Sequence, residues 1–548
     1  MTTLYMQSGV LIVGAGPTGL TLANLLGQAD ITTIILDRKA STVAEPRAVS
    51  IDDESLRTMQ AIGLADEVLR DVVPGYGVHY FDRPGGHCFG KVEPTSTAYG
   101  FPKRNAFRQP LFEATLRKGM DRFASLTQCF NHELLSFTQD EQRVVAQVRN
   151  AAGEQITISA DYLIACDGGR SPVRKQLGVA MVGSSFQSRW LVVDTDQDDD
   201  PFWQTRVYCD ARRPIVEVPG PHKTRRFELM LRPDESDEQM LDDAKLRELL
   251  RPFRDDKPTS VVRKTVYTFH ARVAERWNVG RVFLAGDAAH LTPPYAGQGM
   301  NSGIRDAHNL GWKLIQVLRS GMHPSVLDTY EQERRGHAWA LIQLALNLGV
   351  VMAPASALRA RLISGLFRVI GHIPPLRDYF LQMRFKPKPR FTQGLVVSSS
   401  ITAPFRTGEM FPQPTLEDSE GRDCKLDDLI GDGFALIQCG RAQSNALDQL
   451  QHPLWAALGA RQIIVEPGDA PASVAQQGGP SILRDRHNAL PAAFFESRAI
   501  IVLRPDRYIA ALFDCHDEMH VADSLQALFN PQPVASATPF ALAAEALR

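Results

Sequence analysis

A glycine-rich turn near the N-terminus is the first part of the chain whose residue types and spacing suit a particular chemistry. Gly14, Gly16 and Gly19 form a GxGxxG pattern directly after the apolar run 10–13. Apolar residues at helical spacing follow, and a second apolar run then ends in Asp37. An acid about 20 residues beyond such glycines is placed to bind ribose hydroxyls. The order of strand, glycines, helix, strand and acid predicts dinucleotide binding rather than a turn that binds nothing.

Each of these residues has a physical task in that interpretation. Gly14 permits the tight turn, Gly16 lets a pyrophosphate approach the backbone, and Gly19 allows the helix to pack closely on the strand. The helix N-terminus offers free N–H groups and a partial positive charge to the phosphates. Arg38, which directly follows Asp37, is also predicted to bind the cofactor. The motif by itself does not distinguish NAD from FAD.

Two later motifs also place an acid directly after a strand-like run. The run 162–166 leads into Asp167, and the run 281–285 leads into Gly286 and Asp287. Both acids lie just past the C-terminal end of a buried strand, where open α/β sheets bind their ligands. Taken singly, Asp167 is also a common type of turn carboxylate, and Asp287 a common type of helix N-cap.

A second glycine-rich loop continues from the Asp287 motif and opens a predicted helix at Asn301. Apolar and small residues from Ile304 to Leu318 recur at three- and four-residue spacing, which is typical of a helix. The loop directs N–H donors and the positive end of the helix dipole toward whatever lies before it.

Together, the GxGxxG, DGxxSxVR and GDAAH…P…GQGxN motifs resemble those of the class A FAD-dependent aromatic hydroxylases. The resemblance implies that Asp287 binds the ribityl chain of FAD and that Asp167 lies where both FAD and the nicotinamide are engaged. It also implies that the loop 297–301 lies against the flavin ring, where N–H donors stabilise the negative charge of the reduced flavin. The loop residues that the resemblance places at the cofactor are Pro293, Gly297, Gly299, Met300 and Asn301. By position, the resemblance adds two cofactor residues, Arg47 at the flavin and Gln109 at the adenosine side.

Further segments over most of the chain resemble the branch of this family that hydroxylates 3-(3-hydroxyphenyl)propionate in aromatic catabolism. The resemblance implies that NADH, or NADPH, is the transient electron donor to FAD and that O₂ is the co-substrate. A phenolic acid would then be hydroxylated ortho to its hydroxyl group, giving 2,3-dihydroxyphenylpropionate, with 3-hydroxycinnamate as a second substrate. The alternatives are a hydroxylase of another phenol or of resorcinol, an FAD oxidase or dehydrogenase, a flavin-binding protein without monooxygenase activity, and a plain NAD dehydrogenase. The segments are 46–59, 104–110, 225–228, 330–335 and 383–387.

Two residues are candidates for direct contact with that substrate. Asp52 aligns with an acid that relatives place at the phenol hydroxyl, but it also belongs to an acidic run that opens a helix, where acids favour the dipole. Arg226 is the candidate for the carboxylate tail, because arginine binds carboxylates in a bidentate manner. Arg225, Lys103 and Arg104 are alternatives, and each is also consistent with a solvated surface charge.

The predicted fold (α/β + β) is a Rossmann-like FAD-binding domain with an inserted β-sheet that binds the substrate, followed by a second α/β domain. Alternating segments after Val179 predict the inserted sheet, and the resemblance implies that the C-terminal domain is thioredoxin-like. A basic, proline-punctuated run predicts an extended linker between the domains. The predicted boundaries are 1–180 for the first part of the FAD-binding domain, with substrate-domain segments near 75–110, 181–275 for the inserted sheet, 276–383 for the second part and a helical region, 384–406 for the linker, and 407–548 for the C-terminal domain.

Composition argues against several other classes of protein. The 548 residues carry 60 lysines and arginines against 62 acids, a formal charge of -2 that gives no electrostatic footprint for nucleic acid. No apolar run reaches the ~18 residues that a membrane span needs, and with no secretory signal pattern we expect a cytoplasmic protein. Seven cysteines without CxxC spacing, and histidines without paired metal spacing, predict neither a disulfide framework nor a metal site. A homodimer is left open.

Overall fold

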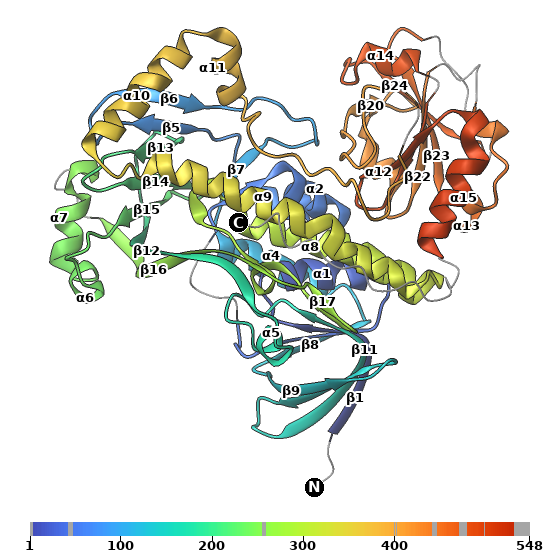
Figure 1. The fold of residues 1–548 in the computed structure, drawn as a ribbon, viewed down its shortest axis with the longest axis horizontal. Helices are drawn as coiled ribbons and strands as arrows, with labels where there is room; N and C mark the ends of the chain where they lie inside the picture. Colours follow the sequence, from blue (N-terminus) through green and yellow to red (C-terminus); the bar gives the residue numbers. More distant parts are fainter. Residues whose placement is uncertain are drawn as a thin grey trace.

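The structure is a computed structural model that describes residues 4–41, 48–254, 259–398, 401, 403–440, 446–470, 479–497 and 499–530, those at 186 and 187 by their backbone alone. A long helix, α9 (Thr329–Met352), crosses the larger body of the protein diagonally in Figure 1. A smaller sheet domain from the C-terminal part of the chain, orange to red in the same view, lies toward one end of that helix.

A mostly parallel sheet forms the base of the larger body. Its strands are β1 (Leu4–Val13), β2 (Thr33–Asp37), β8 (Leu126–Phe130), β9 (Glu133–Gln139), β10 (Val144–Arg149), β11 (Gln155–Ala165), β17 (Asn278–Val279) and β18 (Val282–Leu284). The order is β17-β18-β11-β1-β2-β8, and antiparallel β10 and β9 continue from β11. Because β1 pairs in parallel with both β2 and β11, and β11 with β18, the carboxyl ends of these four strands meet at one edge. All four apolar runs predicted as strands around the cofactor motifs lie in this sheet.

Three helices pack together with this sheet around one hydrophobic core: α1 (Pro17–Gln28), α4 (Gln109–Met120) and α8 (Gly299–Ser320). Leu22, Leu116 and Leu310, one from each helix, are fully buried with Ile12 of β1. Full burial of one such side chain is worth about 1.5–3 kcal/mol, so this core holds the cofactor motifs in a fixed relation. Smaller elements beside it are α2 (Asp53–Ala61), α3 (Ala65–Leu69), α5 (Pro172–Gln176) and a three-stranded sheet of β3 (Ser50–Asp52), β7 (Arg104–Phe107) and β4 (Val72–Pro74).

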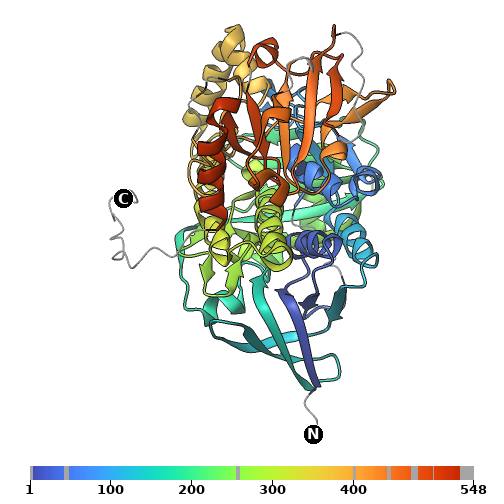
Figure 2. The same ribbon diagram turned by 90° about the vertical axis from the view of Figure 1, so that its right-hand side faces the viewer.

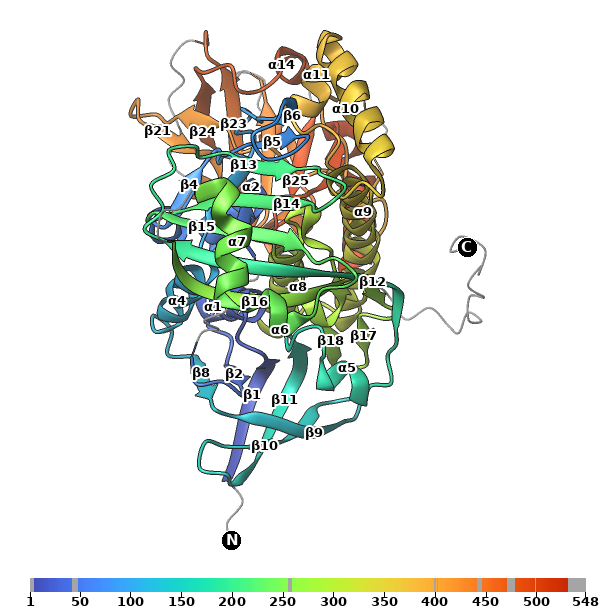
Figure 3. The ribbon, with the colours of Figure 1, turned by 90° about the vertical axis from the view of Figure 1, so that its left-hand side faces the viewer.

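A second eight-stranded sheet stands on the larger body. Its order is β19-β16-β12-β15-β14-β13-β5-β6. Two of its strands come from residues 78–92, far before the others, and β19 comes after two strands of the first sheet, so three separated segments of the chain build it. On its outer face lies α7 (Asp243–Arg254), seen in front of the sheet in Figure 3, and Leu246 packs there against Phe227. The elements are β5 (Val78–Phe81), β6 (Cys88–Val92), β12 (Met181–Asp196), β13 (Thr205–Tyr208), β14 (Ile215–Gly220), β15 (Thr224–Met230), β16 (Ser260–Ala274), β19 (His290–Leu291) and, before α7, α6 (Asp237–Met240).

Two further helices, α10 (Ala357–Gly371) and α11 (Pro374–Leu381), follow α9. Packing against the larger body accounts for α9, but the outer face of α10 is apolar and exposed at Leu358, Leu362 and Leu366. A homodimer that covers this face remains a prediction. In the described part of the chain no single helix is long and apolar enough to cross a membrane, although the bent pair 324–352 and 357–371 passes the same test together.

The C-terminal domain is a seven-stranded sheet with helices beside it (Figure 2). The strand order is β21-β20-β24-β23-β22-β25-β26. β22 pairs in parallel with β23 and antiparallel with β25. Its elements are β20 (Thr415–Glu417), β21 (Asp423–Lys425), α12 (Leu426–Ile430), β22 (Ala435–Cys439), α13 (Leu454–Ala457), β23 (Arg461–Pro467), β24 (Ser481–Asp485), α14 (Ala492–Glu496), β25 (Ile500–Leu503), β26 (Ile509–Phe513) and α15 (Glu518–Phe529).

Buried ion pairs join this domain to the larger body. Arg57 of α2 makes a bidentate pair with Asp427 of α12, at 2.6 and 2.7 Å. Arg504 donates to both carboxylate oxygens of Glu333 in α9, at 2.7 and 2.8 Å. Burial of the Glu333 carboxyl opposes its ionisation, but Arg504 and Lys313 outweigh that effect and hold its pKa well below the usual range. The two domains are therefore docked through charges that water does not screen.

We expect Arg504→Met to weaken this docking strongly. Removing one partner of a buried pair leaves the other charge uncompensated, which costs about 3–5 kcal/mol. The thermal unfolding midpoint should fall by several degrees. The matched control is Arg422→Met, because Arg422 is exposed and pairs with Asp418 at 2.9 Å on the surface, where a pair is worth about 1 kcal/mol or less. Equal shifts for the two variants would contradict the role given to Arg504.

Candidate active site

The three glycines of the N-terminal turn meet different surroundings. Gly14 has a φ of +107°, and a Cβ there would lie 2.3 Å from the carbonyl oxygen of Cys166, so no other residue fits. A Cβ on Gly19 would lie 2.0 Å from the carbonyl oxygen of Gly14, which is the close helix–strand packing predicted for it. Gly16, the N-cap of α1, has no atom within 4 Å of its Cβ position. The turn is therefore packed on two sides and open on the side where a pyrophosphate would approach.

Asp37 lies at the end of β2 and braces the same turn. Its carboxylate accepts hydrogen bonds from the N–H groups of Ala15, at 2.8 Å, and Lys39, at 2.9 Å. Arg38 is exposed and, with Lys39 and Arg149, lines a surface cavity of about 520 Å³ beyond the strand end. Asp37 and Arg38 thus lie together at the carboxyl end of β2, and their role at a ribose stays a prediction.

Asp167 follows β11 at the same sheet edge and carries an unused acceptor. One carboxylate oxygen, Oδ2, accepts the N–H of Val173 at 3.2 Å. The other, Oδ1, is buried and finds no hydrogen-bond partner in the described part of the chain. Burial raises the pKa of this carboxyl. A buried polar atom without a partner is costly, so an external donor is expected at Oδ1.

Asp287 lies in the short 3₁₀ helix η1 (Gly286–Ala288) at the end of β18. The N–H of Gly286 donates to Asp306 at 3.1 Å, and a Cβ on Gly286 would lie 2.5 Å from Oγ1 of Thr18 in α1. Asp287 follows directly after this contact and is half-buried. The three strand ends predicted to bind the cofactor meet in one place.

The second glycine loop is tied to β3 by one side chain. The amide oxygen of Asn301 accepts the N–H of Asp52 at 3.0 Å and the hydroxyl of Ser55 at 2.8 Å, while its amide nitrogen donates to the carbonyls of Ser50 and Gly297. Asn301 was predicted to contact the cofactor and to begin the helix. The helix begins two residues earlier, at Gly299, and the Asn301 side chain shapes the loop.

The first turn of α8 is left open. No side chain caps it within the described residues, and it contains no acid. Its first N–H groups follow the loop that contains Pro293 and Gly297, and Met300 in this turn is partly buried against the core. An anionic group is the ligand that such an uncapped N-terminus favours.

Two other predicted cofactor residues are Arg47 and Gln109. Arg47 lies outside the described residues. Gln109, at the start of α4, accepts the N–H of Ala48 at 2.8 Å and donates to Glu113 at 2.7 Å. Gln109 thus holds the chain directly after Arg47.

These features fit a bound flavin dinucleotide. The open side of Gly16 and the uncapped start of α8 suit anionic groups, and the unused oxygen of Asp167 suits a hydroxyl or N–H donor. All three lie at the carboxyl edge of one parallel sheet.

Asp52 is surrounded by cations that sequence reasoning missed. It is the N-cap of α2, accepting the N–H of Ser55 at 3.0 Å, and its carboxylate pairs with Arg305 and, at 2.8 Å, with Lys386. Burial opposes ionisation of Asp52, but the two cations outweigh it and hold its pKa well below the usual range. Lys386 comes from the run predicted as a linker, and no local pattern in the sequence signals this contact.

A second buried group supports α8 from behind. Asp306 accepts from His290 at 2.7 Å and from Arg334 at 2.9 Å. Burial opposes the charge of Asp306, and these two partners lower its pKa. His290 stacks on Trp277 with ring centroids 5.3 Å apart. His290 therefore packs and supports the loop, as predicted, and does not face an open site.

The second sheet turns an apolar, aromatic face toward the loop. Trp190 and Phe269 of this face lie beside Tyr295, which belongs to the 3₁₀ helix η2 (Pro294–Ala296) within the loop. Arg226 lies on the same face, as a substrate contact requires, but its guanidinium makes a bidentate pair with Asp194 at 2.7 and 3.1 Å. Its charge is thus already balanced within the sheet.

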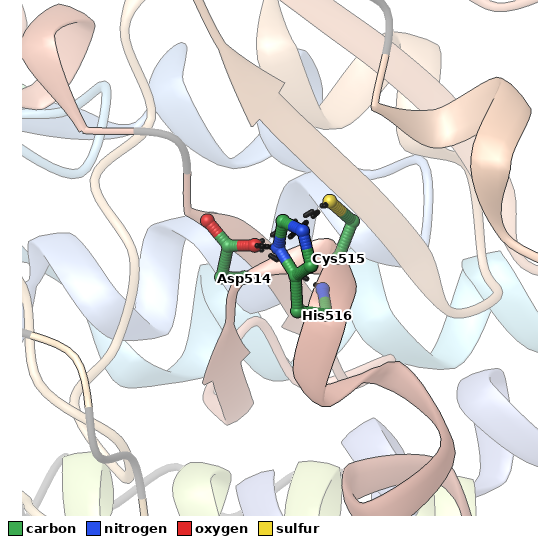
Figure 4. A group of neighbouring side chains, drawn as sticks. All are labelled: Asp514, Cys515 and His516. Atoms are coloured by element: carbon green, nitrogen blue, oxygen red, sulfur yellow. Dashed lines mark hydrogen bonds and ion pairs between the residues drawn. The ribbon is translucent and has the colours of Figure 1, made fainter.

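Two clusters have the spacing of metal ligands. One is Asp52, Asp53 and Glu54, where Arg305 and Lys386 already supply positive charge. The other, shown in Figure 4, is the consecutive trio Asp514, Cys515 and His516 in the C-terminal domain. There Oδ1 of Asp514 is bonded to Nδ1 of His516 at 2.6 Å. The absence of a resident metal remains a prediction.

Comparisons with known proteins agree with this geometry. Residues 7–345 match the FAD binding domain family, and residues 408–528 match the HcaD C-terminal domain family. The chain is 40% identical over 509 residues to a 3-(3-hydroxy-phenyl)propionate/3-hydroxycinnamic acid hydroxylase of Klebsiella pneumoniae subsp. pneumoniae, covering 92% of this chain and 91% of the relative. It is 40% identical over 530 residues to a protein of the same name from Burkholderia cenocepacia, covering 95% and 96%.

Two solved structures have the same fold. The flavin-dependent monooxygenase PieE in complex with FAD and substrate matches with a TM-score of 0.78 at 21% identity, over 96% of this chain and 99% of that one. A ternary complex of aklavinone-11 hydroxylase with FAD and aklavinone matches with a TM-score of 0.75 at 23% identity, over 95% and 99%.

We expect Gly16→Val to reduce FAD content without unfolding the protein. The Cβ position is open and the backbone, with φ −83° and ψ −177°, suits any residue, so only a ligand would meet the new side chain. Absorbance of bound flavin per protein measures the loss. The control is Gly336→Val, since Gly336 in α9 also has no atom within 4 Å of its Cβ position. Full FAD occupancy in Gly16→Val would contradict the pyrophosphate site.

Asp53 should make stability depend on pH near neutrality. Burial, together with Asp52 and Glu54, raises its pKa to about 7. The folded state then holds a proton between about pH 4 and pH 7 that the unfolded state has released, so stability falls as pH rises, by at most about 1.4 kcal/mol per unit. Asp53→Asn removes this loss of stability. The melting temperature of the variant minus that of the wild type should therefore increase from pH 5 to pH 7 and stay constant above pH 7.

The matched control for that pH series is Asp140→Asn. Asp140 is a surface carboxyl whose pKa backbone hydrogen bonds lower. It stays ionised in both states over this pH range, so its difference from the wild type should be constant. A constant difference for Asp53→Asn as well would show that Asp53 is ionised in the folded protein.

Proposed function

The chain belongs to the FAD binding domain family and is an FAD-dependent monooxygenase, and we propose that it hydroxylates a phenolic acid with a short carboxylate tail. The proposed substrate is 3-(3-hydroxyphenyl)propionate, with 3-hydroxycinnamate as a second one. The observation that carries this proposal is the 40% identity, over more than nine-tenths of both chains, to relatives that bear those substrates in their names. The proposed product is 2,3-dihydroxyphenylpropionate.

The reaction consumes NADH and O₂ in this proposal. FAD, when bound, supplies the redox chemistry that passes two electrons from the nicotinamide to O₂ and delivers one oxygen atom to the ring. The second oxygen atom leaves as water, so one phenol, one O₂, one NADH and one proton give one catechol, one NAD⁺ and one water. The residues proposed to hold FAD are Gly14, Gly16, Gly19, Asp37, Arg38, Arg47, Gln109, Asp167, Gly286, Asp287, Pro293, Gly297, Gly299, Met300 and Asn301.

The start of α8 is proposed to stabilise negative charge on the flavin ring. Its first N–H groups are uncapped, and Asn301 fixes the loop in front of them through four hydrogen bonds. Donors that are already oriented act without reorganising at the moment of reaction. Asn301 is in this view a positioning residue for the loop rather than a direct ligand.

The aromatic face of the second sheet is proposed to hold the substrate ring. Trp190, Phe269 and Tyr295 contact one another there. Burial and neighbouring groups raise the pKa of Tyr295 to about 12, so its hydroxyl stays a hydrogen-bond donor. Aromatic rings pack well in such surroundings and exclude water from the reacting atoms.

Asp52 is proposed to act through its neighbours rather than as a base. A carboxylate whose pKa is held below the usual range is a weak acceptor for a phenol proton. Its backbone N–H reaches Asn301, and its carboxylate holds Arg305 and Lys386. Asp52 therefore joins β3, α8 and the segment after α11, and helps to place the loop.

The C-terminal domain is proposed to be thioredoxin-like and structural. Its central strands follow the order β23-β22-β25-β26, with β22 and β23 parallel and β25 reversed. Cys439 ends β22, and burial raises the pKa of its thiol well above the usual value. A thiol of that kind is not reactive toward disulfides. The domain's contribution is the docking on α2 and α9.

We expect purified, FAD-containing protein to oxidise NADH faster when 3-(3-hydroxyphenyl)propionate or 3-hydroxycinnamate is added. Phenol and resorcinol, which lack the tail, should stimulate much less. With ¹⁸O₂, one heavy oxygen atom should enter the product, measured by mass spectrometry. NADH oxidation that yields hydrogen peroxide and an unlabelled organic product would indicate an oxidase instead. Bound FAD with no turnover for any of the four compounds would indicate a flavin-binding protein without this activity.

A further inference from the structure

Several cations lie near the face of the second sheet that looks toward the loop, and carboxylates balance most of them. Arg226 pairs with Asp194 at 2.7 Å. Arg263 reaches the same Asp194 at 3.4 Å. Lys386 pairs with Asp52 at 2.8 Å. None of these three brings an uncompensated positive charge to the proposed ring site.

Arg104 differs from them. Its Nη2 donates to the hydroxyl of Tyr76 at 3.1 Å, and its guanidinium carbon lies 4.8 Å from the centre of the Tyr76 ring. Its Nε is buried and has no hydrogen-bond partner in the part of the chain that the structure describes. Within those residues no carboxylate pairs with Arg104. A buried N–H of a charged group without an acceptor is costly, so this side chain is suited to an external anion.

The position of Arg104 on β7 places it beside the ring site. On the same strand, Ala106 pairs in register with Ser50, whose Cβ lies 3.3 Å from the Cβ position of Gly297 in the flavin loop. Ala106 also belongs to the apolar cluster that includes Trp190. Arg104 comes two residues earlier, on the same side of the strand and about 6.6 Å away. Arg104 therefore lies about the width of one aromatic ring from the point where β3 and β7 meet the loop that contains Gly297.

Neighbouring acids do not neutralise this charge. Asp52 is the register partner of Arg104 on β3, but its carboxylate is turned to Arg305 and Lys386. Burial raises the pKa of the neighbouring Tyr80 to about 12 even with Arg104 close by, so this hydroxyl carries no negative charge. The surroundings of Arg104 are thus aromatic and apolar, and they strengthen its attraction for a carboxylate.

We propose that Arg104 binds the carboxylate tail of the substrate, in place of Arg226, and so selects phenolic acids over neutral phenols. This inference rests on the proposed function of the same site. The planar guanidinium, held against the Tyr76 ring, presents Nε–H and the remaining Nη hydrogens to two carboxylate oxygens. The hydroxyl end of the ring then points toward the flavin loop.

Two compounds test this proposal, 3-(3-hydroxyphenyl)propionate and 3-propylphenol, in which a methyl group replaces the carboxylate at the end of the tail. In Arg104→Met, KM for the acid should rise about 10- to 100-fold, because charge-assisted hydrogen bonds are lost. KM for 3-propylphenol should change less than about threefold on the same grounds. Arg104→Lys keeps the positive charge but loses the planar guanidinium that donates two parallel hydrogen bonds, so it should recover part of the affinity for the acid. An equal rise of KM for both compounds would overturn the proposal and leave Arg104 a packing residue.

Lys103→Met is the matched control, since Lys103 precedes Arg104 and donates to the carbonyl of Gln382 at 3.3 Å. It should change the ratio of the two KM values by less than about threefold, as expected of a residue outside the anion contact. If the wild type turns over neither compound, the proposed reaction fails. Titration with the acid, followed by the spectrum of the bound flavin, then still measures binding. Equal Kd values for the wild type and Arg104→Met would overturn the proposal that Arg104 binds the carboxylate. Arg104→Gln is the second variant if Arg104→Met does not retain FAD.

Discussion

A helix with an open N-terminus has to be held in place by something other than a cap, and that constraint organises the site. Polar side chains hold the first turns of α8: Asn301 binds β3, Arg305 pairs with Glu54 at 2.5 Å, and Asp306 binds His290. Further along, Lys313 pairs with Glu333 at 2.9 Å. Because these contacts are made by side chains along α8 and not by a cap at its N-terminus, the first N–H groups of the helix stay available for an anion.

The same arrangement explains why so many charges are buried. Each buried pair costs desolvation that its mutual attraction only roughly repays, so such pairs are weak evidence for added stability. Here they specify geometry. Glu333 is shared by Lys313 of α8 and by Arg504 of the C-terminal domain, and Asp52 is shared by Arg305 and by Lys386. The C-terminal domain and the segment after α11 are thereby tied to the helix whose start faces the flavin.

Much of the cofactor side could be predicted from sequence because each motif is local. Gly14, Gly16 and Gly19 have the turn, open side and close packing that their spacing predicts. The partners of Asp52 could not be predicted, since they lie 253 and 334 residues away. The register between strands could not be predicted either, so the sequence does not reveal that Arg226 lies opposite Asp194. These contacts are decided by tertiary packing.

Asp52 shows how such pairing changes the chemistry of a residue that a resemblance selects. A base for a phenol needs a carboxyl whose proton affinity approaches that of the phenolate, and burial alone would supply this by raising the pKa. Arg305 and Lys386 reverse that effect. The same two cations are balanced by Asp52 and Glu54, so they bring no uncompensated positive charge to the proposed ring site. This pairing fits the proposal that Asp52 holds the loop in place rather than taking the proton of the substrate.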